Sequence, residues 1–86
     1  MAVSEEIKHL SAPDAINQLS EHIVGNPEDD EAYYLRGMKY WSLGLRKEAI
    51  NDFHSALRIN PESNARMMLE FSNSVLDFYN KDLLNP

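Results

Sequence analysis

Histidines, carboxylates and glycines are the residues of this chain that could take part in chemistry, and none shows the spacing of a catalytic or metal site. The histidines His9, His22 and His54 are far apart and form no HExxH motif. The carboxylates gather in short runs, at Glu5-Glu6 and over 28–31, where a helix start accounts for them without acid–base chemistry. Each of the three glycines stands alone, so no phosphate-binding loop is present. We therefore expect no enzymatic activity, no cofactor and no metal.

The charge of the chain argues against polyanionic partners. Its 86 residues carry a formal net charge of −6, with 8 Lys and Arg against 14 Asp and Glu. The basic residues are scattered: Lys8, Arg36, Lys39, Arg46, Lys47, Arg58, Arg66 and Lys81. Nucleic acids and anionic membranes attract clustered basic residues, so neither is an expected partner.

The cellular compartment follows from what the sequence lacks. The chain has no cysteine, and a domain of this size in an oxidising compartment often depends on disulfides. Its first residues show no apolar run of the signal-peptide type, and no stretch approaches about 18 apolar residues. These features predict a cytoplasmic protein.

The sequence repeats itself at an offset of 34 residues. Identical or similar residues recur at this distance: Ala15-Ile16-Asn17 and Ala49-Ile50-Asn51, Leu19 and Phe53, Ile23 and Leu57, Asn26-Pro27-Glu28 and Asn60-Pro61-Glu62. A period between about 20 and 50 residues is typical of stacked supersecondary units. The chain is therefore expected to contain one full repeat and part of another.

The full repeat has the pattern of a helical hairpin. Residues 31–43 are apolar around nearly the whole helix, which therefore needs cover on more than one side. The acidic run 29–31 suits a helix start, and Gly44 suits a left-handed helix end. Residues 46–59 place apolar side chains on one stripe, and Asn60-Pro61 ends that helix. Two helices joined by a short turn are predicted.

These residues resemble the tetratricopeptide repeat family, whose signature is W-x-x-L-G-x-x-Y…A-x-x-x-F…P. The matching positions are Tyr33-x-x-Arg36-Gly37-x-x-Tyr40, Ala49-x-x-x-Phe53, Ala56 and Pro61. Tyr33 stands in place of the tryptophan and Arg36 in place of the leucine. We expect the Arg36 stem to pack through its methylenes with its charged head in water. The small residues Gly37, Ala49 and Ala56 are expected to let the two helices approach closely.

The resemblance implies an all-α fold of antiparallel helical hairpins, stacked as a short right-handed solenoid. Residues 1–86 then form a single domain with a partial repeat (1–28), a full repeat (29–62) and a C-terminal capping helix (63–86). The partial repeat keeps a short first helix from Val3 to Leu10. Its second helix buries four apolar side chains: Ala15, Ile16, Leu19 and Ile23.

The resemblance also implies a function in protein–protein interaction. In this family the first helix of each repeat lines a concave groove that binds peptides or helices, which here places four residues on the groove: Glu31, Tyr34, Met38 and Trp41. Aromatic and Met side chains are well suited to such binding, so a protein or peptide partner is expected. In the alternative interpretation, the C-terminal helix covers Tyr34 and Trp41 as core. Capture of a C-terminal carboxylate is not expected, because the positions that hold Lys and Asn in such family members hold Tyr34, Leu35 and Met38.

Residues 64–84 have the pattern of a long helix with two apolar stripes. Met68, Phe71, Val75 and Phe78 form the first stripe, and Leu69, Leu76 and Leu83 form the second. We expect the first stripe to cover the preceding hairpin. The second then has nothing left to cover within the chain, and an exposed apolar patch often marks an interface. The alternative function is therefore self-association, as a homodimer, through Leu69, Leu76 and Leu83; alternatively, a further repeat follows.

Overall fold

The computed structural model describes residues 10–72, and this part of the chain is helical with no β-strand. It contains α2 (Ala12–Gly25), α3 (Asp30–Ser42), α4 (Arg46–Ile59) and a further helical segment, residues 65–72. The predicted all-α class is therefore confirmed for these residues. Residues 1–9 and 73–86, which include most of the predicted first helix and most of the predicted C-terminal helix, lie outside the described residues.

Side chains cap the starts of α2 and α3, whereas α4 begins after Leu45 without a side-chain cap. Ser11 caps α2, where its Oγ accepts a hydrogen bond from the backbone N–H of Asp14. Asp29 caps α3 in the same way, since its Oδ1 accepts from the backbone N–H of Ala32 at 3.3 Å. Gly44 follows α3 with a φ of 79°, the left-handed conformation predicted for it. Asn60 ends α4 directly before Pro61.

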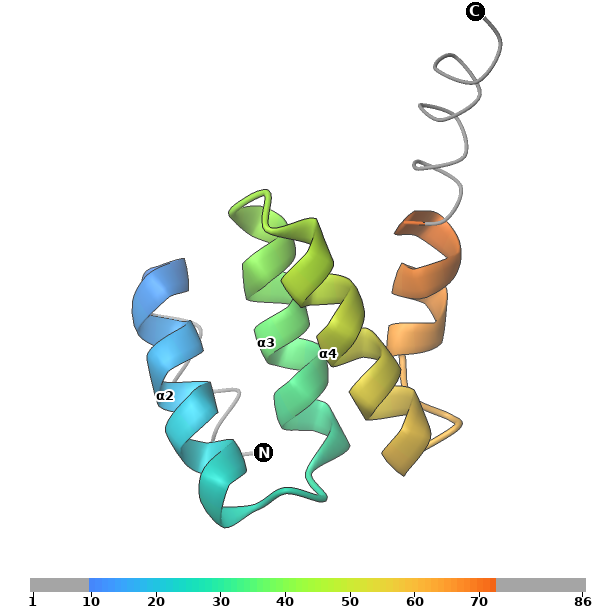
Figure 1. Cartoon of the computed structure of the whole chain (residues 1–86), viewed down its shortest axis with the longest axis horizontal. Coiled ribbons are helices and arrows are strands. Elements are labelled where there is room, and N and C mark those ends of the chain that lie inside the picture. Colours follow the sequence, from blue (N-terminus) through green and yellow to red (C-terminus); the bar gives the residue numbers. More distant parts are fainter. Residues whose placement is uncertain (1–9, 73–86) are drawn as a thin grey trace, which may run out of the picture.

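Successive helices run in opposite directions, with α3 packed between α2 and α4 (Figure 1). This central place explains why α3 is apolar on several faces. Two core clusters result. The first joins α2 to α3 through Ala15, Leu19, Ile23 and Ala32. The second joins α4 to the segment 65–72 through Ala49, Phe53, Ala56, Ala65 and Leu69, with side chains of α3 packed against it.

Helices α3 and α4 approach each other closely at Gly37. A Cβ atom at this position would lie 2.6 Å from Cε1 of Phe53, 2.8 Å from its Cδ1 and 3.2 Å from the carbonyl oxygen of Ala49. Phe53 itself is fully buried. The predicted close approach is therefore correct at Gly37, because the Phe53 ring occupies the space that any other side chain would need.

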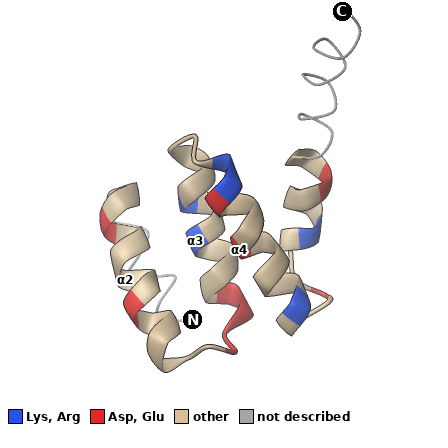
Figure 2. Cartoon of the chain, in the orientation of Figure 1, with Lys and Arg blue, Asp and Glu red and all other residues tan. Residues whose placement is uncertain are grey.

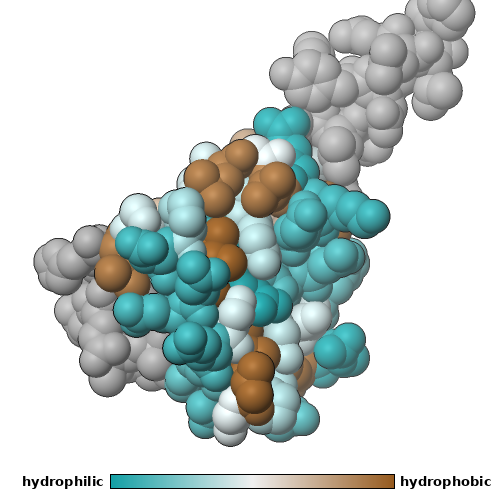
Figure 3. All heavy atoms as spheres, turned by 60° about the vertical axis from the view of Figure 1, so that its left-hand side comes forward, coloured by the Kyte–Doolittle hydropathy of each residue, from teal (hydrophilic) through white to brown (hydrophobic). Residues whose placement is uncertain are grey.

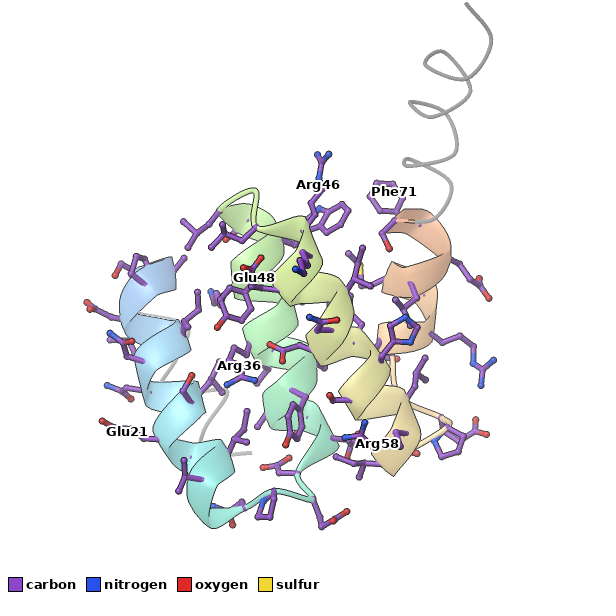
Figure 4. The ribbon with its side chains drawn as sticks, in the orientation of Figure 1. Glu21, Arg36, Arg46, Glu48, Arg58 and Phe71 are labelled. Atoms are coloured by element: carbon purple, nitrogen blue, oxygen red, sulfur yellow. The ribbon has the colours of Figure 1, made fainter. Side chains whose placement is uncertain are left out.

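The expectation that the Arg36 head group lies in water is wrong. Its Nε and Nη2 donate to the two carboxylate oxygens of Asp52, both at 2.8 Å, and its Nη1 donates to Ser20 Oγ at 3.0 Å. The guanidinium also lies over the rings of Tyr33 and Tyr40, at 5.7 and 5.8 Å from the centroids. Arg36 thus joins α3 to both α2 and α4, and its side chain points between the helices in Figure 4.

The Arg36–Asp52 pair is mostly shielded, with side-chain exposures of 19% and 6%. The hydrogen bonds to Asp52 raise the pKa of Arg36 above its ordinary value, against the opposing effect of burial. Because the pKa of Arg36 is higher in the folded than in the unfolded state, its contribution to stability is complete at any pH below the unfolded-state pKa. That contribution is lost only when the pH rises through the folded-state pKa. The protonated form of Arg36 is therefore present throughout the neutral range.

Arg36→Leu is expected to lower the free energy of unfolding by about 1–3 kcal/mol, because it leaves the buried Asp52 carboxylate without its partner. The double variant Arg36→Leu/Asp52→Ala is expected to recover much of this loss, since no charge is then left unpaired. Urea unfolding of the two single variants and the double variant measures the coupling. If Arg36→Leu is as stable as the parent, the contacts of Arg36 do not hold the three helices together.

Candidate partner-binding groove

The predicted groove residues of α3 lie on one side of the helix. Tyr34, Met38 and Trp41 follow the i, i+4, i+7 spacing of a helical face, and all three are half-buried. They pack against the second core cluster, with the Tyr34 and Phe53 ring centroids 6.2 Å apart. Each of these side chains therefore has one side in the core and another that remains accessible in the described part of the chain.

At one end of this face, Trp41 is flanked by an aromatic ring and a cation. The Phe71 ring meets Trp41 edge to face at a centroid distance of 6.0 Å, and the Arg46 guanidinium lies 5.1 Å from the Trp41 ring centroid. Figure 4 shows Arg46 and Phe71 at the same end of the molecule. The segment 65–72 thus covers part of Trp41, which remains half-buried.

At the other end, Glu31 and Tyr34 open into a cavity of about 320 Å³. Asp30, Glu31 and Tyr34 of α3 line one side, and the turn after α4 lines the other with Asn60, Glu62, Ser63 and Asn64. Asn60 fixes this turn, because its Nδ2 donates to Asp30 Oδ2 at 3.1 Å and its Oδ1 accepts from the backbone N–H of Glu62. The face of α3 therefore runs from a polar cavity to an apolar end at Trp41.

The cavity is electronegative. Three of its lining residues are carboxylates and none is basic. Within residues 10–72, the ion pairs at 4.0 Å or less join His22 to Asp29 and Arg36 to Asp52, so neither Glu31 nor Glu62 is neutralised in this way. Figure 2 shows the acidic residues gathered at the start of α3 and in the loop before it.

The self-association face predicted on the C-terminal helix differs from the structure at Leu69. This residue is only 7% exposed and belongs to the second core cluster, while Leu76 and Leu83 lie outside the described residues. Phe71, expected to cover the hairpin, contacts Trp41 of α3 but is 53% exposed. The buried positions of this segment are Ala65, Leu69 and Ser72, at i, i+4 and i+7. Of these, Ala65 and Leu69 pack with side chains of α4 in the second core cluster.

Two of the three histidines lie in the described part of the chain. His54 is exposed on α4. His22 forms a contact that sequence reasoning missed: its Nε2 lies 2.7 Å from Oδ2 of Asp29, the N-cap of α3. Across residues 10–72, no group of three His, Cys, Asp or Glu side chains is arranged to hold a metal ion.

Comparison with known proteins gave no match among family models, curated proteins or solved structures. Among the described residues, none of the helices combines the length and apolar character required to cross a membrane. The face seen in Figure 3 is largely hydrophilic, with separate small hydrophobic patches.

Proposed function

We propose that this chain is a tetratricopeptide-type module that binds a peptide or helix of a partner protein through the face of α3, and that it is not an enzyme. The groove consists of Glu31, Tyr34, Met38 and Trp41 on α3, with the cavity at the Glu31 end and Phe71 beside Trp41. The observation that carries the proposal is this continuous face, which joins accessible aromatic and Met side chains to a preformed cavity.

The helix lengths support the repeat assignment. Helices α2 and α4 are each 14 residues long and begin at Ala12 and Arg46, an offset equal to the period of the sequence. Each is followed by an asparagine as its C-cap, Asn26 or Asn60, and the backbone φ values of these two residues are −140° and −136°. Equivalent sequence segments thus form equivalent helices, as stacked repeats require.

The composition of the face supports a peptide ligand. Aromatic and Met side chains bury a large apolar area and have few polar atoms that need hydrogen-bond partners. They are enriched in the parts of interfaces that contribute most to affinity. The rims of such interfaces are polar, as is the cavity end of this groove. A segment bound here would cover the accessible sides of Tyr34, Met38 and Trp41.

A random-peptide display selection on the full chain, followed by NMR titration of an enriched peptide, tests this function. Chemical-shift changes are expected to concentrate on Tyr34, Met38 and Trp41 and on the cavity residues. The exposed side of α2, at Asn17 and Glu21, serves as the internal control and should not respond. Failure to select any binder, or shifts confined to α2, would contradict the proposal.

Self-association is a second candidate, favoured by exposed apolar side chains on the segment 65–72. Met67 is 71% exposed and Phe71 is 53% exposed. Sedimentation velocity separates the two functions. A dimer that dissociates on dilution would support self-association, whereas a chain that stays monomeric at high micromolar concentration would exclude it and leave the peptide groove.

A further inference from the structure

The two ends of the α3 groove differ in chemistry. The Glu31 end is a cavity lined by the carboxylates of Asp30, Glu31 and Glu62, whereas the other end presents the rings of Trp41 and Phe71. A ligand that matched only one end would leave the other uncovered. The groove therefore favours a segment with two unlike anchors.

The position of Asp30 and Glu31 in the first turn of α3 accounts for those two carboxylates, since the helix dipole stabilises negative charge there. It does not account for Glu62, which reaches the same cavity from the turn after α4. Like charges brought together in this way repel one another. A cation placed among them relieves that repulsion.

The nearby basic residues do not fill this role. Arg58 and Arg66 are exposed and neither lines the cavity, and the Arg66 guanidinium donates to the backbone carbonyl of Pro61. Figure 4 shows Arg58 at the end of α4, close in sequence to the cavity turn. No ion pair within residues 10–72 joins either arginine to Glu31 or Glu62.

We propose that the ligand of this groove is a basic peptide segment that places an arginine in the acidic cavity and an apolar side chain against Trp41 and Phe71. This inference rests on the proposed function and names the chemistry of its partner. A guanidinium suits the cavity because its planar fork binds carboxylates in pairs and its face stacks on an aromatic ring, here that of Tyr34.

The length of α3 sets the spacing of the two anchors. Glu31 and Trp41 are ten residues apart, which corresponds to about 15 Å along a helix. An extended peptide covers this distance in about four to five residues. The predicted ligand therefore carries its arginine and its apolar residue about four to five positions apart.

The test uses peptides from a random display selection on the full chain, with affinity read from the emission of Trp41, the single tryptophan of the chain. Selected peptides are expected to be enriched in an arginine and an apolar residue at this spacing. Glu31→Gln and Glu62→Gln should each weaken binding about 1.4- to fivefold, and together about two- to thirtyfold. Replacing the peptide arginine by the neutral citrulline should cause a similar loss, and added salt should reduce the difference.

Glu21→Gln is the matched control, because Glu21 is an exposed carboxylate on α2 away from the cavity (Figure 4). It should leave affinity unchanged. Glu62→Gln should also leave the melting temperature unchanged or raise it, which separates lost recognition from lost folding. Binders on the α3 face without a basic residue, or binding unaffected by Glu62→Gln, overturn this inference and leave the proposed function standing. Absence of any binder on that face overturns the proposed function as well.

Discussion

Gly37→Leu is expected to unfold the protein. The Cβ atom alone would lie 2.6 and 2.8 Å from two carbons of the Phe53 ring, closer than carbon atoms approach without displacement. The ring cannot move outward at low cost, because Phe53 is fully buried and packed in the second core cluster. Overpacking costs about 1–3 kcal/mol for added methylenes in a tight core, and a full leucine at a helix crossing exceeds that range.

Far-UV circular dichroism with thermal melting measures this effect. Gly37→Ala should already lower the melting temperature, although alanine favours a helix over glycine by about 1 kcal/mol. Gly25→Ala is the matched control, because a Cβ at Gly25 meets no atom within 4 Å and should leave stability unchanged or raised. A folded Gly37→Leu variant with the parent's melting temperature would show that the close contact is incidental.

Phe53→Ala is expected to lower the free energy of unfolding by about 3–5 kcal/mol. The ring is fully buried and joins α3, α4 and the segment 65–72, so its removal leaves a cavity shared by three helices. Small domains have free energies of unfolding of about 5–15 kcal/mol, so this loss is a large part of the total.

Urea unfolding monitored by Trp41 emission tests the Phe53 variant. The neighbouring His54 is exposed on the same helix, and His54→Ala should change stability by no more than about 0.5 kcal/mol. The effects of Gly37→Ala and Phe53→Leu on the free energy of unfolding should also be non-additive. The double variant should lose less stability than the two single variants together, because leucine makes room for the methyl group added at position 37. If Phe53→Ala and His54→Ala unfold at the same urea concentration, Phe53 is not the centre of the core.

The face of α3 could be predicted from the sequence, whereas the cavity at its end could not. Residues Tyr34, Met38 and Trp41 share a helical face because helix geometry fixes the direction of each side chain. Glu62 joins Glu31 only because the turn after α4 returns to the start of α3. A hydrogen bond from Asn60 to Asp30 joins the turn to the start of α3, and no local pattern predicts this contact between residues 30 positions apart.

The role of Arg36 could have been found from the predicted hairpin. Gly37 faces Phe53, so the residues immediately before each of them, Arg36 and Asp52, also face one another. Sequence reasoning instead treated Arg36 as an isolated departure from the family signature. Its charge is matched by a carboxylate on the facing helix, and this match appears only when the two helices are considered together.

Local sequence determined where α3 and α4 begin and end. The bounds of α3 and α4 lie within one residue of those expected, because the Asp29 cap, Gly44 and Asn60-Pro61 act on the backbone within a few residues of themselves. The tertiary structure alone decided which apolar side chains of the segment 65–72 are buried. A helix with apolar residues on several sides can pack in more than one rotation, and burial of Leu69 instead of Phe71 depends on the surface that α4 offers. The spacing of apolar residues predicts that one face of a helix is buried, but the helix packed against it determines which face that is.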